Sequence, residues 1–598
     1  MNERMEPMKE QQSFVTAPDG VRLAVFEWGA RSADTTVVLV HGYPDSHVVW
    51  RPIAEQLAER HHVVAYDVRG AGASDAPRRV SSYTLATLEA DLGAVLQQVS
   101  PERPVHLVGH DWGSIQSWES VTGTALADRI ASFTSVSGPC LDHVGQWFRS
   151  KLRRPSPRAL GQLAWQSVHS WYIGYFHLPL LPPLLWRTAM VKAWPALLHA
   201  IEGVPRGSGA PTFPTDAVRG LALYRANMIP RLSRPRHRPT EIPVQVVLPQ
   251  KDLYVTPSMA GQAPQPYVDR LWRRPLRAGH WAPLTHDAVL ANWIDEFVTH
   301  IEGGPTAPAL QRAEVNRPQQ DGEQKEHAGK LVIVTGAGSG IGRATALAFA
   351  EAGAAVIAAD LNAESAARTA HLASLLGAPR TGSYAVDVSD PAAMEDFAKA
   401  VAEEHGTPDV VVNNAGIGLG GAFLDTQTSD WDAVLGVNLM GVVHGCRLFG
   451  AMMKDHGNGG HIVNIASAAA YLPSRTLSAY ATSKAAVLML SECLRAELSD
   501  DGIGVSAVCP GFVNTAIAKA TRYVGVSSSE QEKLRGKADR LYRMRNLPPE
   551  RVADAVLRAV RENRPVVPVA AEARIGRALS RLSPGTLRAI ARADLTPR

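Results

Sequence analysis

The sequence predicts two α/β domains, each built on a mainly parallel β-sheet. Short β-branched runs alternate with helical patterns over most of the chain, as in parallel sheets. A chain of 598 residues is also longer than one hydrophobic core normally supports. Residues 303–328 are rich in Pro, Gln, Gly and charge and show almost no apolar periodicity, which predicts a linker between the two domains.

The first predicted domain covers residues 13–302. Around residues 143–234 the alternation gives way to a helical, aromatic and Pro-punctuated stretch, which we interpret as an inserted cap. The predicted strands of this domain are Thr36–Val40, His62–Tyr66, Val105–Val108, Ile130–Val136 and Val244–Leu248.

The second predicted domain covers residues 329–570, with Ala-rich helical patterns between its strands. Residues 571–598 are predicted to form a basic C-terminal tail. This tail is either a helical edge, exposed to solvent or in contact with another copy of the chain, or a segment that lies on an anionic membrane surface. The predicted strands are Leu331–Val334, Ala355–Ala359, Ser383–Val386, Val410–Asn413, His461–Ile465 and Val505–Val508.

The overall composition and charge disfavour several classes of function. A formal net charge of +4 without a basic stripe does not indicate nucleic-acid binding. The 4 cysteines share no metal or redox spacing, which favours free thiols and no metal site. The polar N-terminus is not a secretory signal, and Pro and charged residues interrupt the most apolar stretch, 178–198. We therefore expect a cytoplasmic enzyme.

A nucleophile-elbow pattern lies in the first domain. Gly109-His110-Asp111-Trp112-Gly113 follows a predicted strand and opens a helix, which is the pattern G-x-nucleophile-x-G with Asp as the nucleophile. The alternative is a strand-to-helix turn in which Asp111 only caps the helix. His110 is interpreted as structural rather than as a second base.

Three further segments favour the catalytic interpretation. The backbone N–H groups of Tyr43 and Trp112 are placed to form an oxyanion hole. His280 follows an apparent last strand and Asp252 follows Val244–Leu248, so that nucleophile, acid and histidine occur in the hydrolase order. Asp142 is a rival for the position of the acid.

The segments HGYPDS, GHDWGS, KDLYVTP and AGHW resemble the epoxide hydrolase branch of the α/β-hydrolases. This resemblance implies that Asp111 forms an ester with an epoxide carbon and that His280, oriented by Asp252, activates water. It also implies that two cap tyrosines hold the epoxide oxygen. Tyr224 in LALYRANM is one, and Tyr175 is the other, with Tyr172 as its competitor. A haloalkane dehalogenase or an ester hydrolase is the alternative.

A dinucleotide-binding turn opens the second domain. The run Leu331–Gly342 leads from a strand through glycines into a helix, and glycines let the backbone approach a pyrophosphate at the helix N-terminus. Asp360 closes the next strand, and an acid there favours NAD, with NADP as the alternative because of Arg343. The predicted contacts of the turn are Thr335, Gly336, Gly338, Ser339, Gly340, Ile341 and Gly342.

Ser467, Tyr480 and Lys484 form the catalytic set of this domain. Tyr480 and Lys484 are one helical turn apart, so we expect the cation to lower the pKa of the phenol. Together with Asn414-Ala415-Gly416 and Asn438, this pattern resembles the short-chain dehydrogenase/reductase family. The resemblance implies a Rossmann-type doubly wound sheet and hydride transfer between an alcohol and a carbonyl compound.

The same resemblance implies a role for each site residue. Tyr480 is the acid/base, Lys484 binds the nicotinamide ribose, Ser467 holds the substrate oxygen and Asn438 supports a proton relay. The remaining implied cofactor contacts are Asp387, Val388, Asn414, Ala415, Gly416, Pro510, Gly511 and Thr515.

The order hydrolase then dehydrogenase resembles fusion proteins of mycobacteria and related actinobacteria. We expect sequential processing of apolar or lipid epoxides, because hydrolysis yields a diol that a dehydrogenase can oxidise. A homo-oligomer is expected from the resemblance. A protein in which one domain is a non-catalytic scaffold is disfavoured, because both sets of catalytic residues are complete.

Overall fold

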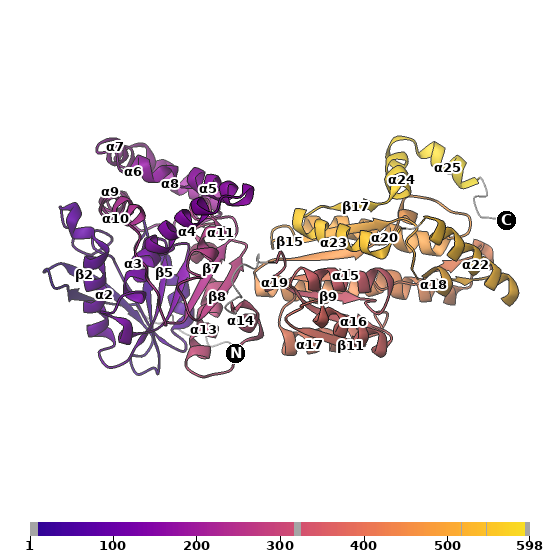
Figure 1. The fold of residues 1–598 in the computed structure, drawn as a ribbon, viewed down its shortest axis with the longest axis horizontal. Helices are drawn as coiled ribbons and strands as arrows, with labels where there is room; N and C mark the ends of the chain where they lie inside the picture. The colour runs from indigo at the N-terminus through magenta and orange to yellow at the C-terminus, as the bar shows by residue number, and fades with distance from the viewer. Residues whose placement is uncertain (1–9, 316–324, 516, 546, 593–598) are drawn as a thin grey trace, which may run out of the picture. The chain divides into compact units, whose positions relative to one another are not determined.

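The computed structural model describes residues 10–315, 325–515, 517–545 and 547–592. The chain forms two compact units, Met1–Gln320 and Asp321–Arg598, and each is described by itself (Figure 1).

The first unit is built on an eight-stranded sheet in the order β1-β2-β4-β3-β5-β6-β7-β8. Pairing is parallel from β4 to β8, whereas β1 and β2 run antiparallel at one edge. The sequence patterns did not predict these two edge strands. The strands are β1 (Gln11–Thr16), β2 (Arg22–Trp28), β3 (Thr36–Val40), β4 (His62–Tyr66), β5 (Val105–His110), β6 (Ile130–Val136), β7 (Val244–Pro249) and β8 (Leu271–Leu276).

Helices cover both faces of this sheet, and a separate group of helices forms the cap above its carboxyl edge (Figure 1). The helices of the main body are η1 (His47–Trp50), α1 (Arg51–Leu57), η2 (Val80–Tyr83), α2 (Leu85–Val99), α3 (Trp112–Val121), η3 (Ala127–Arg129), α11 (Pro257–Gln262), α12 (Ala282–Thr285) and α13 (Asp287–Ile301). The cap helices are α4 (Leu141–Arg153), α5 (Pro157–His169), α6 (Trp171–Phe176), α7 (Leu181–Arg187), α8 (Ala189–Leu197), η4 (Leu198–Glu202), α9 (Phe213–Arg219) and α10 (Leu221–Ser233).

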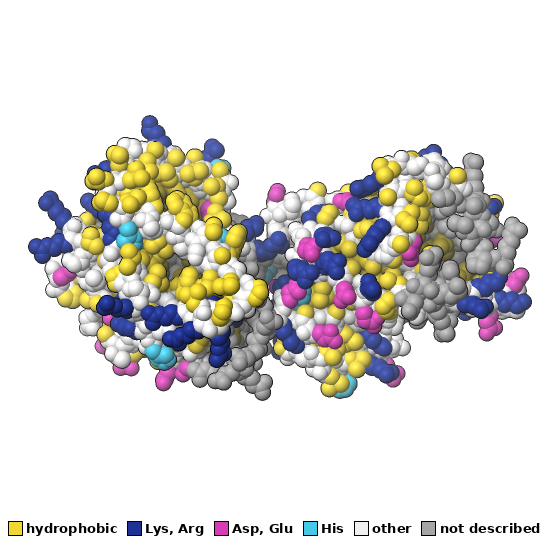
Figure 2. Space-filling view, turned by 45° about the horizontal axis from the view of Figure 1, so that its top comes forward, with side chains coloured by type: hydrophobic (Ala, Val, Ile, Leu, Met, Phe, Trp, Pro, Cys, Tyr) yellow, Lys and Arg dark blue, Asp and Glu magenta, His cyan; other side chains and the backbone are white. Residues whose placement is uncertain are grey.

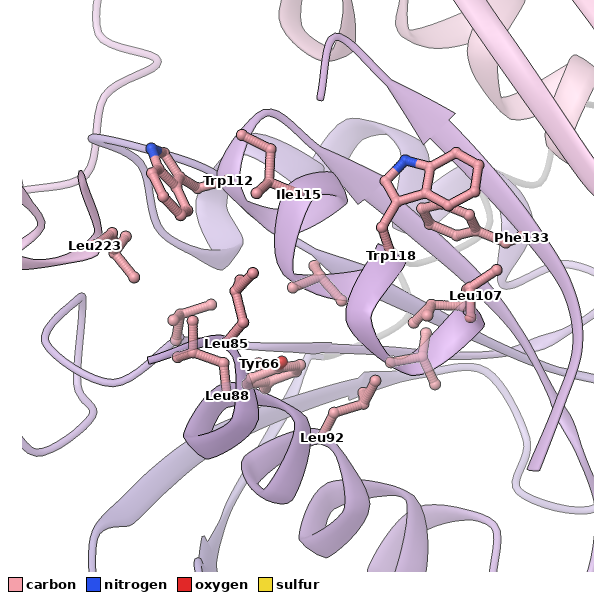
Figure 3. Packing of buried hydrophobic residues seen from close by; sticks show 14 of the residues in the cluster. Tyr66, Leu85, Leu88, Leu92, Leu107, Trp112, Ile115, Trp118, Phe133 and Leu223 are labelled. Atoms are coloured by element: carbon pink, nitrogen blue, oxygen red, sulfur yellow. The ribbon is translucent and has the colours of Figure 1, made fainter. Parts of the chain in front are cut away.

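A fully buried apolar layer supports the nucleophile turn from below. Figure 3 shows Trp112 and Ile115 of α3 on the side of Leu85 and Leu88 of α2, and Trp118 of the same helix beside Phe133 of β6. Burying large side chains of this kind contributes about 1.5–3 kcal/mol each, so the helix that follows the turn is held firmly against the sheet.

Part of the stretch predicted as a linker is folded against the first unit. Helix α14 (Pro308–Ala313) buries Leu310 completely against Trp272 and Phe297. The backbone N–H of Val315 donates to the carbonyl of Leu271 at 2.7 Å. One leucine was enough to anchor this short helix, and a single apolar residue leaves no periodicity for a sequence pattern to reveal.

The second unit is built on a seven-stranded, fully parallel sheet in the order β11-β10-β9-β12-β14-β15-β17. This is the doubly wound order of dinucleotide-binding sheets with one added strand. Its strands are β9 (Leu331–Thr335), β10 (Ala355–Asp360), β11 (Thr381–Ala385), β12 (Val410–Asn413), β14 (Gly460–Ile465), β15 (Ile503–Pro510) and β17 (Val566–Val569), and β13 (Leu419–Gly420) pairs separately with β16 (Arg522–Tyr523).

The helices of the second unit continue to the end of the described chain. They are α15 (Gly340–Glu351), α16 (Ala363–Leu375), α17 (Pro391–His405), η5 (Phe423–Asp425), α18 (Thr428–Leu435), η6 (Gly436–Met440), α19 (Gly441–His456), η7 (Ala468–Ala470), α20 (Ser478–Glu497), α21 (Ile517–Ala520), α22 (Ser528–Arg545), α23 (Pro549–Glu562), α24 (Ala571–Leu582) and α25 (Pro584–Arg592).

The residues predicted as a separate basic tail are therefore part of the domain as far as residue 592. Ala573 on α24 and Leu587 on α25 are buried. The tail was predicted from its arginines, but the small and apolar residues between these arginines form the packed side of both helices.

One stretch of the described chain, Thr428–His456, is long and apolar enough to cross a membrane by length and composition. It contains Val442, Cys446 and Phe449, which lie in the buried core of the second unit.

Candidate active sites

Asp111 stands at a sharp corner between β5 and α3. Its backbone has φ 50 and ψ −121, a left-handed region that a residue with a Cβ rarely adopts. One carboxylate oxygen, Oδ2, accepts a hydrogen bond of 2.7 Å from the backbone N–H of Tyr43. The predicted oxyanion donor Tyr43 therefore already contacts the nucleophile, while Trp112 follows Asp111 directly as the first residue of α3.

Glycines surround this corner because no side chain fits there. A Cβ on Gly42 would lie 2.5 Å from the Cβ of Asp111. A Cβ on Gly113 would collide with the carbonyl oxygen of Val40, and one on Gly138 with the carbonyl oxygen of Asp111. The strained turn thus depends on close backbone contact from three sides.

His280 lies between two carboxylates. Its Nε2 is 3.6 Å from Oδ1 of Asp111, and its Nδ1 is 3.0 Å from Oδ2 of Asp252. Burial disfavours the imidazolium, but the carboxylates of Asp252 and Asp111 outweigh burial and raise the pKa of His280 well above its usual value. The backbone N–H groups of Tyr254 and Val255 donate to Asp252 and hold it in place.

The structure favours Asp252 over Asp142 as the acid. Asp142 lies in a separate ion-pair group with Arg231 and Arg236, and its Oδ1 accepts from the backbone N–H of Arg236 at 2.8 Å. It serves the attachment of the cap to the core and does not contact His280 in the described ion pairs.

The structure places Tyr172, rather than the predicted Tyr175, beside Tyr224. The rings of Tyr172 and Tyr224 are 6.0 Å apart. Burial raises the pKa of both phenols well above the usual value, and the nearby Asp111 carboxylate raises them further. Burial alone raises the pKa of Tyr175, whose ring contacts Trp171 and Phe176. Tyr172 and Tyr175 lie three residues apart on the same short helix, α6, so the motif alone could not choose between them.

Sequence reasoning missed three further groups around His280. The ring of Tyr254 lies 4.8 Å from the His280 ring. Burial raises the pKa of Asp45 to about 7 even though Trp281 Nε1 donates to it at 3.0 Å. Glu202 of the cap contacts Gly279, and burial raises its pKa as well. Asp45 lies in HGYPDS and Tyr254 in KDLYVTP, so the quoted motifs contained a signal for both.

The glycine-rich turn of the second unit has the geometry of a phosphate site. Gly336 and Gly340 have φ 61 and 52, and α15 starts at Gly340. A Cβ on Gly336 would lie 2.8 Å from the Cα of Ala415, and one on Gly342 would collide with the carbonyl oxygen of Gly336. Asn414 fixes the turn by donating from Nδ2 to the carbonyls of Thr335 and Gly336 at 3.0 Å.

Asp360 sits at the end of β10 beside this turn. Its Oδ2 accepts from the backbone N–H of Gly338 at 2.8 Å. Arg343 donates to the carbonyl of Gly338 and, over 3.1 Å, to the hydroxyl of Thr369. These two contacts hold the guanidinium of Arg343 against the turn.

Ser467, Tyr480 and Lys484 come together at the carboxyl end of the sheet. Tyr480 and Lys484 lie on α20, and the Lys484 ammonium donates to the carbonyl of Ile465 at 2.9 Å. Asn438 lies in the π-helix η6, where its side chain bonds both backbone groups of Ile417 and donates to Ser483 at 3.2 Å.

The expectation that Lys484 would lower the pKa of Tyr480 is wrong for this structure. Burial raises the pKa of Tyr480, and only a hydrogen bond with Ser467 opposes it. Burial also lowers the pKa of Lys484 to about 8. A lysine that is itself desolvated stabilises a neighbouring phenolate less than a fully charged one does.

A cavity of about 750 Å³ contains most of the predicted cofactor contacts. Its volume falls in the range of ligand and cofactor pockets. A dinucleotide fits the glycine cradle, the Asp360 carboxylate and the buried Lys484 around this space. Among the predicted residues, the cavity is lined by Gly336, Ser339, Gly340, Ile341, Asp360, Asp387, Val388, Asn414, Ala415, Gly416, Ser467, Tyr480, Lys484, Pro510, Gly511 and Thr515. Thr335, Gly338, Gly342 and Asn438 support it from outside the lining.

The C-terminal helices form one wall of this cavity. Leu587 and Ala591 of α25 line it together with Glu572 at the start of α24. Oε1 of Glu572 accepts a hydrogen bond of 2.9 Å from the backbone N–H of Phe512, in the loop after β15. No motif in the sequence indicated this wall.

Comparisons with known proteins match both units. A model described as alpha/beta hydrolase fold matches residues 35–287, and one described as short chain dehydrogenase matches residues 330–523. Over 598 residues the chain is 43% identical to "Probable oxidoreductase EphD" of Mycobacterium tuberculosis (strain ATCC 25618 / H37Rv), covering 98% of this chain and 99% of the relative. The chain belongs to this family of hydrolase–dehydrogenase proteins.

Other similar proteins are dehydrogenases that match only part of this chain. D-threitol dehydrogenase of Mycolicibacterium smegmatis is 42% identical over 32% of this chain and 72% of its own length. The solved structure of a short chain dehydrogenase/reductase from Burkholderia phymatum in complex with NAD is 32% identical, covers 45% of this chain and 97% of its own, and has a TM-score of 0.40. The predicted fold class is confirmed, and the second unit is an NAD(P)-type short-chain dehydrogenase domain.

Proposed function

We propose that the first unit hydrolyses epoxides to diols through an ester on Asp111. The observation that carries this proposal is the pair of buried phenols, Tyr172 and Tyr224, close to the Asp111 carboxylate. Phenols with raised pKa keep their protons and can donate them to an epoxide oxygen, whereas a departing halide needs no proton.

In the first step an oxygen of Asp111 attacks an epoxide carbon and the carbon–oxygen bond of the ring breaks. The developing alkoxide takes a proton from one of the two phenols, which leaves a phenolate and a neutral ester. Since the ester carries no negative charge, His280 loses one of the two carboxylates that raise its pKa. The imidazole therefore releases its proton to solvent more readily in the intermediate, and it takes a proton back from solvent once the Asp111 carboxylate is restored.

In the second step neutral His280 takes a proton from water, and the water oxygen adds to the carbonyl carbon of Asp111. The N–H groups of Tyr43 and Trp112 stabilise the tetrahedral oxyanion. Collapse breaks the ester bond, and His280 returns its proton to the departing alcohol. The new carboxyl group ionises, and its proton restores the phenol.

Two experiments test this proposal. A single turnover in ¹⁸O water, followed by mass analysis of the peptide that contains Asp111, is expected to place label in that carboxylate. Tyr172→Phe and Tyr224→Phe should each slow epoxide opening by about 10²-fold, whereas Tyr175→Phe is the matched control and should keep the wild-type rate. Halide release from haloalkanes with unchanged turnover in Tyr224→Phe would favour a dehalogenase instead.

We propose that the second unit interconverts an alcohol and a carbonyl compound and prefers NAD to NADP. A bound dinucleotide supplies or accepts the hydride. Tyr480 exchanges a proton with the substrate oxygen, which Ser467 holds, and Lys484 lies one turn away. The Asp360 carboxylate repels a 2′-phosphate. The Arg343 guanidinium is already engaged with the carbonyl of Gly338 and the hydroxyl of Thr369.

We further propose that the two activities act in sequence on apolar or lipid epoxides, the diol from the first unit being oxidised by the second. The test is to supply a fatty epoxide with NAD and to follow both diol and NADH. A diol that accumulates without NADH formation contradicts the coupling and leaves the separate activities intact.

We also propose a homo-oligomer that works in the cytoplasm. The homo-oligomer is supported by the resemblance to dehydrogenases that commonly self-associate. The cytoplasmic location is supported by the four free cysteines, three of them buried, because free thiols suit a reducing compartment. Light scattering of the full-length protein and fractionation of cells test these two statements.

A further inference from the structure

The cap of the first unit exposes an unusual amount of apolar surface. Six large side chains on α5 to α7 and η4, here called the cap face, are each at least 58% exposed: Trp165, Val168, Trp171, Leu180, Leu184 and Ile201. Figure 2 shows this area as a mostly hydrophobic surface over the upper part of the hydrolase unit. A contiguous patch of this kind on a folded protein marks an interaction surface.

The cap face is separate from the side of the cap that closes the active site. On α5, Leu163 and Gln166 are buried while Trp165 and Val168 point outward. On α7, Trp186 is buried while Leu184 is exposed. These helices are therefore apolar on two sides, and only one of the two is needed for the fold.

The Lys, Arg, Asp and Glu side chains of the segment that carries the cap face, 143–201, all have one sign. No Asp or Glu occurs between His143 and Ile201. Within the same segment Arg153, Arg154, Arg187 and Lys192 are exposed. A second copy of this surface would bring like charges together, whereas an anionic surface is complementary to it.

We propose that the cap face docks on an anionic lipid bilayer, with Trp165 and Trp171 in the interfacial layer and the arginines against the headgroups. Exposed tryptophans beside Lys and Arg are the composition of helices that lie in a membrane interface. This proposal goes beyond epoxide hydrolysis, because it gives the cap a second role: it binds the bilayer in which apolar substrates are dissolved. The C-terminal helices, which line a cavity in the second unit, are not needed for this contact.

Vesicle flotation of the full-length protein tests the proposal. The protein is expected to float with vesicles of phosphatidylcholine and phosphatidylglycerol, and at least about tenfold less with phosphatidylcholine alone. The double variant Trp165→Ser/Trp171→Ser should lose at least about tenfold in partitioning, and Arg153→Gln/Arg154→Gln should weaken binding most at low salt. Leu424→Ser in the second unit, 91% exposed, is the matched control and should bind like the wild type.

Each variant is first checked for dehydrogenase turnover and for hydrolysis of a small soluble epoxide, so that a misfolded protein is recognised. The proposal is overturned if the protein does not float with anionic vesicles, or if Leu582→Ser on α24 abolishes flotation while the tryptophan variant retains it. It is also overturned if the cap variants change only the oligomeric state in light scattering, since the cap face would then join copies of the chain.

Discussion

Glu572 accepts a hydrogen bond of 2.9 Å from the backbone N–H of Phe512. The contact joins the first turn of α24 to the loop that follows β15 and borders the cofactor cavity. A Cβ on Gly511 would collide with the Glu572 carboxylate, so the loop and the helix are closely fitted. The C-terminal helices thus help to position the residues on the nicotinamide side of the site.

Replacing Glu572 is therefore expected to weaken cofactor binding. Glu572→Ala should raise the KM for the dinucleotide by about threefold to tenfold, because it removes one hydrogen bond to a charged acceptor. Steady-state kinetics with varied cofactor measures this effect. Glu572→Gln keeps an acceptor at Oε1 and should restore most of the loss, and Arg574→Gln should have no effect. Equal damage from Glu572→Gln would argue against positioning through Phe512.

Replacing Asp252 by Asn is expected to affect activity, whereas the same replacement at Asp142 is expected to affect stability. Asp252→Asn should lower epoxide hydrolysis by about 10²–10⁴-fold, because His280 loses the group that orients it. Asp142→Asn should keep most of the activity but lower the free energy of unfolding by about 1–3 kcal/mol, since it disturbs a partly buried contact with arginine. Rate assays and denaturant unfolding separate the two effects. Loss of turnover in a stable Asp142→Asn protein would contradict the assignment of the acid.

The buried Lys484 should make stability depend on pH. Its pKa is lowered to about 8 from an ordinary value of 10.5, so between these pH values the unfolded chain binds the proton and the folded chain does not. Stability therefore rises with pH across this window, and below pH 8 the buried charge costs about 3 kcal/mol. Lys484→Met should raise the Tm at pH 7 by about 5 °C and remove dehydrogenase activity. Thermal scans from pH 7 to 10 should be flatter for this variant.

Asp360 is expected to control the choice of cofactor. Asp360→Ser removes the negative charge beside the glycine turn and should raise kcat/KM with NADP relative to NAD by about tenfold or more. Asp387→Ser, at the adenine side of the same cavity, is the control and should change both cofactors alike. An unaltered ratio in Asp360→Ser would mean that this carboxylate does not set the preference.

The sequence was most informative where chemistry requires a fixed local pattern. The turn around Asp111, the glycines of the second unit and the Tyr480–Lys484 spacing are all local, and the structure places each as expected. The choice between Tyr172 and Tyr175 depended on the ring contacts that each side chain makes, which tertiary packing decides. Strand β2, between β1 and β4, is buried at six of its seven residues, so it lacks the alternation that would reveal an antiparallel strand.

A few buried residues explain the remaining differences. Leu310 is buried in the docked helix of the expected linker, and Ala573, Gly576 and Leu587 are buried in the helices of the expected tail. Burial of Tyr480 itself raises its pKa, and the spacing of the motif does not show this burial.

The crowding of Gly42, Gly113 and Gly138 around Asp111 has a consequence for mutational surveys of this enzyme. None of these glycines has a side chain that could take part in catalysis, yet adding one methyl group would push the reactive carboxylate out of its corner. A saturation screen should therefore find that these glycines tolerate substitution as poorly as Asp111 itself. Positions that tolerate substitution without loss of activity should begin only beyond the residues that contact this corner.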